Sequence, residues 1–367
     1  MLSSLDPLAV SSRQLPPEHA GKLVHTWPCG VAPPPIREGE VAGKFGHRFV
    51  WSPLHWTRAQ LEPWRLKGDC AVDRLIEAVQ PGPADDLVEM ARLAASSNSH
   101  PPKSVPNPLP SPQRREELAS WYKEVSTPPA WVDWQQLARG QDVFIANAPA
   151  AALALYYLSL VGGFSAPLIT RVLRATAYLT APPKHVMRRL IDTGAMITAC
   201  VHGGADALKP GGAGWKAALQ VRVLHAKVRQ RLLARKYWNR KEWGVPINQE
   251  DMAATLLAFS YNVLVGIELV AGSPLPQQEQ EDYMALWRYI GWVLGVETRG
   301  KLDPCRSVPH AKATLESVIM HLLDPDEHSV AVAHHLLKAP GEGLLQVRHT
   351  VVRCVRIRSS SPSVVYK

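Results

Sequence analysis

Cysteine is scarce in this sequence, and the cysteines that are present form no pattern. The 367 residues contain five cysteines and no Cys-x-x-Cys pair: Cys29, Cys70, Cys200, Cys305 and Cys354. An odd number of widely spaced cysteines excludes a disulfide scaffold, argues against a structural zinc site and favours a reducing compartment.

Several recurrent motifs are missing as well. The sequence has no Gly-x-Gly-x-x-Gly or Gly-x-x-x-x-Gly-Lys-Ser/Thr loop, no His-Glu-x-x-His and no Gly-x-Ser-x-Gly. These absences argue against a nucleotide-dependent enzyme, a zincin metalloprotease and an α/β-hydrolase. The N-terminal residues MLSSLDPLAV lack a basic stretch followed by an apolar one, so we expect no signal peptide and an intracellular protein.

Acidic residues are outnumbered by basic ones. Lys and Arg total 41 and Asp and Glu total 32, which gives a formal net charge of +9. The strongest basic run lies in residues 222–241, which contain no acidic residue. No recognised nucleic-acid motif accompanies this run, so we expect no nucleic-acid partner. An anionic membrane surface remains a candidate partner.

Strand-like alternation of apolar and polar residues is missing before the C-terminal tail, whereas helical periodicity recurs along the chain. The predicted helices are 58–80, 147–161, 166–179, 184–201, 214–236, 249–271, 277–294, 309–323 and 327–338, with helical patterns also near residue 114 and over 131–137. Asn248 is predicted to cap the helix that follows it. The predicted fold class is therefore all-α.

These patterns predict one large helical domain with an appendage at each end. Residues 1–60 are expected to form an irregular segment that wraps around the domain. The all-α domain is expected to span residues 61–340, interrupted by a Pro-rich loop at 96–113. Residues 341–367 are expected to form a basic tail.

Residues 143–170 carry no charge, and most of them are apolar. The run is long enough to span a bilayer. Asn147, Pro149 and Ser159 dilute it, and its many alanines are weakly hydrophobic. We therefore favour a buried core helix over a membrane span for this segment.

The segment QVRVLHAKVRQRLL (220–233) places a histidine at the edge of an apolar stripe. Taking His225 as zero on a helix, Val221, Val228 and Leu232 lie at about −40°, −60° and −20°. Arg222 and Arg229 lie on the other side, at about +60° and +40°. This arrangement suits a b-type heme, in which the imidazole binds iron and the arginines pair with propionates or nearby acids. A histidine that simply packs in the core is the alternative.

A second predicted helix could provide an opposite wall. Arg189, Thr193, Met196 and Cys200 follow i, i+4, i+7 and i+11 spacing and share one face. The polar pair could line the far side of a flat cofactor, with the two sulfur-containing residues as a soft apolar wall. The alternative is an ordinary helix that buries Met196 and Cys200 in the core.

Seven segments of the chain, taken in order, carry a family resemblance. They are RLKGDCAVDRLI (65–76), RRLIDTGAM (188–196), KPGGAG (209–214), RVLHAKVR (222–229), GVPINQEDMAATLLAFS (244–260), LWRYIGWVLGV (286–296) and HLLDPDEHSVAVAHHLL (321–337). Together they resemble the catalytic domain of the latex-clearing proteins (rubber oxygenases), which is shared with fungal ER-bound oxygenases of the mycophenolic acid pathway type. The resemblance covers roughly residues 62–337.

The resemblance implies a globin-like helical core that holds heme b and uses O₂ to cleave an isoprenoid C=C bond. It implies that His225 is the axial iron ligand and that Arg222 and Arg229 support it. It makes Arg189 and Thr193 the pair on the opposite side of the heme. Rubber oxygenases carry a lysine before that threonine, whereas this chain has Asp192, which could act as an acid or base there.

The sequence thus predicts a heme-dependent oxygenase that acts on a lipophilic small molecule, with prenylated compounds as a candidate class. Its partners would be that substrate, O₂ and a membrane surface, with the endoplasmic reticulum as the candidate membrane. Two alternatives remain open: a non-catalytic heme-binding protein, and a heme-free helical protein that uses its basic face for interactions.

Overall fold

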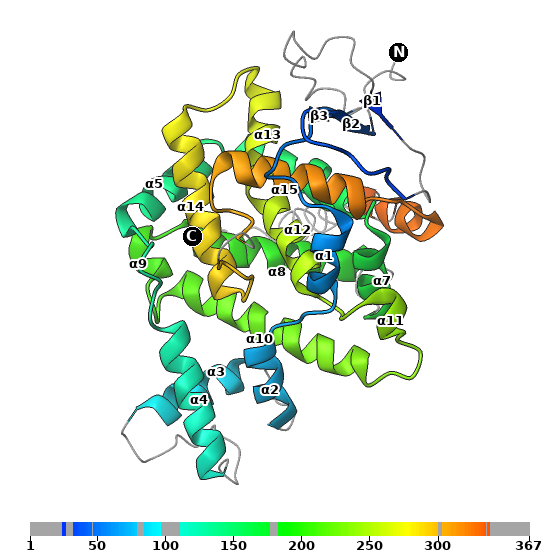
Figure 1. The fold of residues 1–367 in the computed structure, drawn as a ribbon. Coiled ribbons are helices and arrows are strands. Elements are labelled where there is room, and N and C mark those ends of the chain that lie inside the picture. The colour runs from blue at the N-terminus through cyan, green and yellow to red at the C-terminus, as the bar shows by residue number, and fades with distance from the viewer. Residues whose placement is uncertain are drawn as a thin grey trace, which may run out of the picture.

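A computed structural model describes residues 24–26, 32–45, 47–78, 84–96, 111–176, 183–299, 303–334 and 336–337. Helices dominate this structure, which confirms the all-α prediction (Figure 1). The helices are α1 (Arg58–Arg65), α2 (Cys70–Ala78), α3 (Ala84–Ala95), α4 (Pro112–Val125), α5 (Trp134–Ala146), α6 (Ala148–Leu153), the π-helix η3 (Ala154–Val161), α7 (Pro167–Ala175), α8 (Pro183–Val201), α9 (Gly204–Leu208), α10 (Ala213–Leu233), α11 (Arg240–Trp243), α12 (Gln249–Phe259), α13 (Tyr261–Ala271), α14 (Gln277–Val293) and α15 (Val308–His321).

The predicted helices coincide with observed ones, but three of them are divided. The predicted helix 58–80 is α1 and α2, and 147–161 is α6 and η3. The predicted helix 249–271 breaks at Ser260, whose hydroxyl donates to the Leu256 carbonyl at 2.8 Å. Asn248 caps α12 as predicted, because its Oδ1 accepts from the Asp251 amide at 2.9 Å. Most of the Pro-rich loop and all of the C-terminal tail lie outside the described residues.

A small sheet contradicts the prediction that the first 60 residues are irregular. It contains β1 (Val24–His25), β2 (Val41–Lys44) and β3 (His47–Val50), in the order β1-β2-β3. β1 pairs with β2 in parallel, and β2 pairs with β3 in antiparallel register. All four residues of β2 are buried. A strand covered on both faces shows no alternation of polar and apolar residues, so the sequence pattern could not reveal it.

The sheet is tied to α15 by a buried carboxylate, Glu316. Nε2 of His47 and Nε2 of His55 each lie 3.0 Å from a different oxygen of this carboxylate. The Ser52 amide donates to His55 Nδ1 at 3.0 Å, so Nε2 of His55 carries the proton that bonds to Glu316. Burial alone would raise the pKa of Glu316, but the two histidines and nearby Lys312 lower it to about 2. The N-terminal segment is therefore fixed by a polar cluster as well as by packing.

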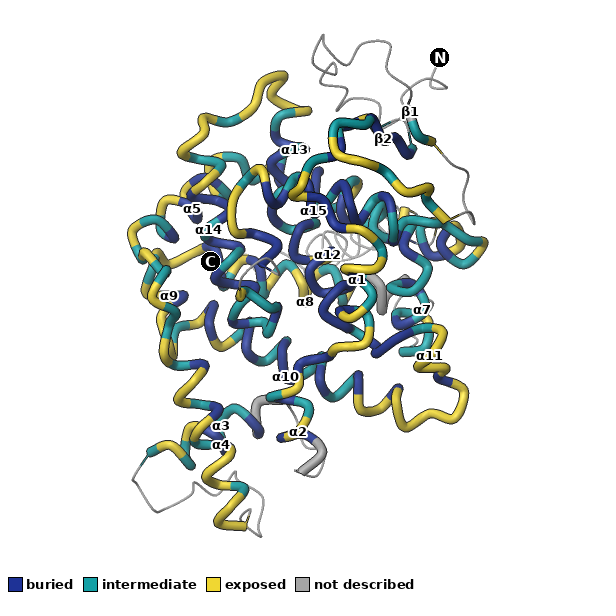
Figure 2. The backbone as a smooth tube through the Cα atoms, in the orientation of Figure 1, coloured by how far each residue is buried: buried dark blue, intermediate teal, exposed yellow. Residues whose placement is uncertain are grey.

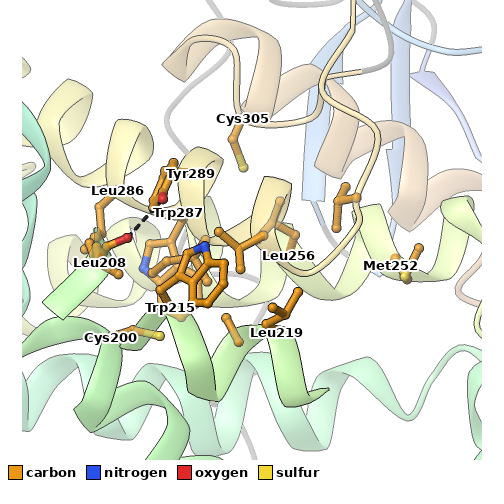
Figure 3. Packing of buried hydrophobic residues seen from close by; sticks show 14 of the residues in the cluster. Cys200, Leu208, Trp215, Leu219, Met252, Leu256, Leu286, Trp287, Tyr289 and Cys305 are labelled. Carbon is orange, nitrogen blue, oxygen red and sulfur yellow. Dashed lines mark hydrogen bonds between the residues drawn. The ribbon is translucent and has the colours of Figure 1, made fainter. Parts of the chain in front are cut away.

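The main core lies between α5, α8, α10 and α14. Figure 3 shows the Trp215 and Trp287 side chains together within it, with Leu208 and Cys200 beside them. The Tyr289 hydroxyl, on α14, donates to the Leu208 carbonyl at 2.9 Å, drawn as a dashed line in Figure 3. Burial on this scale gives the helices a fixed frame in which individual side chains can be positioned.

The uncharged run at residues 143–170 is bent rather than straight. The helical pair Trp134–Ala146 and Ala148–Val161 turns by 81° at Asn147. Val143, Ala151 and Ala154 are buried in the core, whereas Leu153 and Tyr157 are exposed. Within the part of the chain that the structure describes, Gln249–Ala271 is long and apolar enough to cross a membrane, and half of it is buried in the protein.

Candidate active site

The helix that carries His225, α10, lies unusually close to α8 at one point. A Cβ atom on Gly214 would sit 2.5 Å from the Ala199 carbonyl oxygen and 2.8 Å from the Cys200 Cα atom. Only glycine allows the two backbones to approach this closely. The contact fixes how α8 faces α10, and α8 carries the predicted residues of the opposite wall.

Arg222 on α10 forms a buried ion pair with Asp69, directly before α2. Its Nε lies 2.6 Å and its Nη2 3.2 Å from the two carboxylate oxygens, so the contact is bidentate. Gly295 packs against this ion pair, and a Cβ there would collide with the Asp69 carboxylate. The φ of Gly295 is +85°, a conformation that also favours glycine. The guanidinium is thus held by protein, which matches the predicted option of pairing with a nearby acid.

Arg229, two turns along α10, forms a parallel pair with Asp73. Nε of Arg229 lies 2.7 Å from Asp73 Oδ1, and the arginine is only 1% exposed. Burial raises the pKa of Asp73, while the Arg229 guanidinium acts to lower it. Nη1 of Arg229 also donates to the Ile247 carbonyl at 3.0 Å.

Ile247 holds a strained backbone conformation at this contact. Its φ is +51°, which is rare for a β-branched side chain. The next residues of the same segment are also fixed, because the Gln249 amide nitrogen Nε2 donates to the carbonyls of Gly68 and Gly295 at 3.2 and 3.0 Å. The segments around residues 68, 247 and 295 therefore meet beside α10.

His225 lies between these two arginines in sequence. Its Nδ1 is buried and has no hydrogen-bond partner among the described residues. Burial, together with the charges of Arg229 and Arg189, lowers the pKa of His225 to about 4, while the charge of Asp69 acts to raise it. The imidazole is therefore neutral near pH 7, which is the form that can bind a metal. A buried ring nitrogen without a partner is also uncommon enough in native proteins to call for an explanation.

Three residues on α8 were predicted to be catalytic: Arg189, Asp192 and Thr193. Among the described residues, Arg189 is the one of these three whose charge acts on His225. It is half-buried, and burial lowers its pKa to about 10, with Asp192 opposing the shift. Asp192 and Thr193 are both exposed. The carboxylate of Asp192 acts electrostatically on Arg189, one turn earlier on the same helix.

Met196 and Cys200 continue the same face of α8 into the core. Cys200 is fully buried, with its Sγ 3.8 Å from the Met196 sulfur and 3.5 Å from the Gly214 carbonyl. Burial raises the pKa of the Cys200 thiol to about 12. These two residues therefore belong to the packing between α8 and α10, as the core alternative predicts, whereas Thr193 on the same face is exposed.

Sequence patterns alone did not identify Asp69 and Asp73 as functional residues. Both lie in the segment RLKGDCAVDRLI, and their i, i+4 spacing places them on one side of a helix turn. Arg222 and Arg229 are spaced seven residues apart, about two helical turns. The two aspartates and the two arginines therefore each form a row of like charges along their own segment. The opposite charges of the two rows were the available signal for these ion pairs. The sequence around each segment does not show that the two segments are in contact.

His225 by itself provides one ligand, which is too few to bind a bare metal ion. Over the described residues, no three His, Cys, Asp or Glu side chains form a group that could hold a metal ion. A porphyrin brings four nitrogen ligands of its own, so it needs one or two from the protein. His225, neutral and with an unsatisfied ring nitrogen, fits this requirement.

Comparison with known proteins agrees with the observed fold. Residues 134–363 match the family model described as "ER-bound oxygenase mpaB/B'/Rubber oxygenase, catalytic domain". This match spans more than half of the chain, and the chain therefore belongs to this oxygenase family. The match extends into residues 341–363, which the sequence predicted to be an appendage.

One solved structure has a similar fold: "Structure of Latex Clearing Protein LCP in the closed state". The TM-score is 0.51 and the sequence identity 19%, over 73% of this chain and 67% of that chain. At this level of identity the likeness shows a shared fold. No curated protein sequence matched the chain.

Proposed function

We propose that this protein is a heme b-dependent oxygenase that uses O₂ to oxidise or cleave a C=C bond in a lipophilic small molecule. Membership of the oxygenase family supports the reaction class. The observation that carries the cofactor assignment is His225, whose buried Nδ1 has no partner and whose pKa is lowered to about 4. In this proposal the His225 imidazole would bind the heme iron.

Bound heme would supply the iron that activates O₂, and the protein would supply the ligand and its surroundings. The Arg222–Asp69 and Arg229–Asp73 pairs hold the two turns of α10 on either side of His225. They thereby fix the direction of the imidazole. Burial of the ring, helped by the charges of Arg229 and Arg189 and opposed by that of Asp69, lowers the pKa of His225 and keeps a proton off the ring, so the ligand is available near pH 7.

The residues of α8 are assigned to the side from which substrate would approach. Arg189 provides a cation beside His225, and its charge would attract electron density that develops on oxygen during the reaction. We assign the exposed Thr193 hydroxyl and Asp192 carboxylate to hydrogen bonding and to proton transfer at this side. The carboxylate is a different group from the lysine of the rubber oxygenases, so its role here is a distinct one.

The proposed substrate class is a lipophilic molecule, with prenylated compounds as the first to test. The family description names ER-bound members, and we propose that this protein likewise works inside the cell at the endoplasmic-reticulum membrane. Apolar side chains that remain exposed, such as Leu153 and Tyr157 on α6 and η3, would suit contact with such a substrate.

The decisive experiment is the visible spectrum of the protein supplied with heme, compared with His225→Ala. We expect a Soret band in the wild type that is lost or displaced in the variant, because the variant lacks the axial ligand. His202→Ala is the matched control, since this histidine is exposed in the turn after α8. Far-UV circular dichroism should show that all three proteins are folded.

The outcomes separate the proposed function from its alternatives. A wild type that is helical but shows no Soret band would overturn the heme assignment and favour the heme-free protein. A Soret band that depends on His225, without O₂ uptake in the presence of prenylated alkenes and a reductant, would favour a non-catalytic heme protein. O₂ uptake that also requires Arg189 would support the oxygenase and its proposed site.

A further inference from the structure

A basic surface covers the C-terminal end of α10 and the short helix α11. Five cationic side chains are exposed there: Arg231, Arg235, Lys236, Arg240 and Lys241. None of the five makes an ion pair with a described residue, and the acidic Glu242 that follows them is bonded to Asn239 at 3.0 Å. Figure 2 shows this end of α10 and the loop toward α11 as mostly exposed.

Two large apolar side chains are exposed within the same stretch. Leu233 is 41% exposed and Tyr237 55% exposed. They alternate with residues that fill the core, since Leu232 and Trp238 are buried together with Val172. The outward position of Leu233 and Tyr237 therefore does not come from a poorly packed end of the helix.

The loop that presents Tyr237 is held firmly. The Trp238 indole nitrogen donates to the Gly244 carbonyl at 3.0 Å. Its ring packs edge-on against Trp243, with 5.4 Å between centroids. Arg171, on α7, covers the other side of Trp243 at 4.2 Å from the ring centroid. This segment is thus firmly held, and it exposes both cations and apolar side chains to solvent.

We propose that this basic surface, Arg231 to Lys241 with Leu233 and Tyr237, docks the protein on an anionic lipid membrane. Lysine and arginine are attracted to anionic headgroups, while leucine and tyrosine insert at the boundary between headgroups and acyl chains. Nucleic acid would also attract the cations, but it offers no acyl layer for an exposed leucine. The combination of both kinds of side chain therefore favours a lipid partner.

The docking surface lies on the same helix as His225. Arg231 lies six positions after His225, which is about 9 Å along the helix axis. Docking here would place the proposed active site close to the membrane that dissolves a lipophilic substrate. This role in substrate delivery rests on the proposed function, whereas the docking itself does not.

The test is sedimentation of the full-length protein with phosphatidylcholine vesicles, with and without phosphatidylserine. Arg235→Gln/Lys236→Gln/Arg240→Gln removes three cations from the surface, and Leu233→Ser/Tyr237→Ser removes the apolar pair. Arg115→Gln/Lys123→Gln/Lys216→Gln is the matched control, because it removes the same charge at exposed positions on α4 and the start of α10. Each variant is checked by circular dichroism.

We expect salt-sensitive binding of the wild type to the anionic vesicles. Each cation near such a surface strengthens binding about fivefold, so the cation variant should lose at least about tenfold and the control little. The apolar variant should also bind more weakly. Binding is read without heme or turnover, so this result is independent of the proposed activity.

Three results would overturn the proposal. One is a wild type that does not bind anionic vesicles. A second is equal loss in the cation variant and in the matched control, which would show a general effect of net charge. The third is binding to a single-stranded RNA oligomer, but not to vesicles, that needs the cations and ignores the Leu233→Ser/Tyr237→Ser change.

Discussion

Two buried arginines on α10 show how a charged side chain can serve a site without touching the reacting atoms. Arg222 and Arg229 are almost fully covered, and each has a carboxylate partner from the α2 region. Removing one partner of such a pair is far more costly than the net stabilisation that the pair provides, because a bare charge is left inside the protein. The pairs are therefore best tested through the acid rather than the arginine.

Asp69→Asn should reduce the free energy of unfolding by about 3–5 kcal/mol, because it leaves the Arg222 guanidinium buried without its counter-charge. Urea unfolding of the two proteins measures this difference. Asp206→Asn is the control, since Asp206 pairs with Lys209 on the surface and its loss should have no measurable effect. Equal stabilities of wild type and Asp69→Asn would show that the buried pair is unimportant.

At the scale of elements, the close crossing of α8 and α10 requires that residue 214 be a glycine, which has no Cβ. Gly214→Ala would place a Cβ within 2.5 Å of the Ala199 carbonyl oxygen, so the helices would have to separate. We expect a loss of about 1–3 kcal/mol in the free energy of unfolding. Binding of the proposed heme should weaken as well, because Arg189 and His225 would move apart.

Gly194→Ala provides the control on the same helix. This glycine lies within α8, and a Cβ there would meet nothing within 4 Å. Replacing an unhindered helical glycine with alanine usually stabilises a helix by about 0.5–1 kcal/mol. Thermal unfolding of both variants should thus move in opposite directions, and a shift in the same direction would argue against the close crossing.

Helices were predictable from the sequence because their signal is local. An apolar stripe repeats every three or four residues, as it does in 277–294, and the structure has α14 at nearly the same bounds. The break at Ser260 was not predictable, because the apolar pattern continues through it. The strands were missed because each is four residues or shorter and β2 is buried on both sides.

The candidate site was predictable only on its own helix. Helical arithmetic placed Arg222 and Arg229 on one side of His225, and the structure shows both turned toward α2. Their partners lie more than 150 residues earlier in the chain, so only the folded protein shows which acids they meet. The same holds for Ile247, whose strained backbone has no signature in its residue type.

At the scale of the whole molecule, Glu316 makes the free energy of unfolding depend on pH. Its pKa is lowered to about 2 from an ordinary value of 4.5. Its carboxylate therefore stabilises the folded state above pH 4.5, and this contribution is lost as the pH falls from about 4.5 toward 2. Glu316→Gln should be less stable than the wild type at pH 7, with the gap closing across that range.

Urea unfolding at pH 7, 4.5 and 3 measures this closing gap. Glu89→Gln is the comparison, since Glu89 forms an exposed pair with Arg92 and its gap should be small at every pH. A gap for Glu316→Gln that stays constant from pH 7 to 3 would mean that the interaction with His47 and His55 does not depend on the carboxylate charge.

The pairing of α2 with α10 bears on where this polypeptide can be cut. The family match begins at residue 134, yet Asp69 and Asp73 lie well before it. A fragment trimmed to the matched region would leave the guanidinium groups of Arg222 and Arg229 buried without their carboxylate partners. It would also expose the side of α10 that packs against α2. Proteolysis between the two segments would weaken the same support, so the yield of folded protein should depend on the integrity of the segment that carries Asp69 and Asp73.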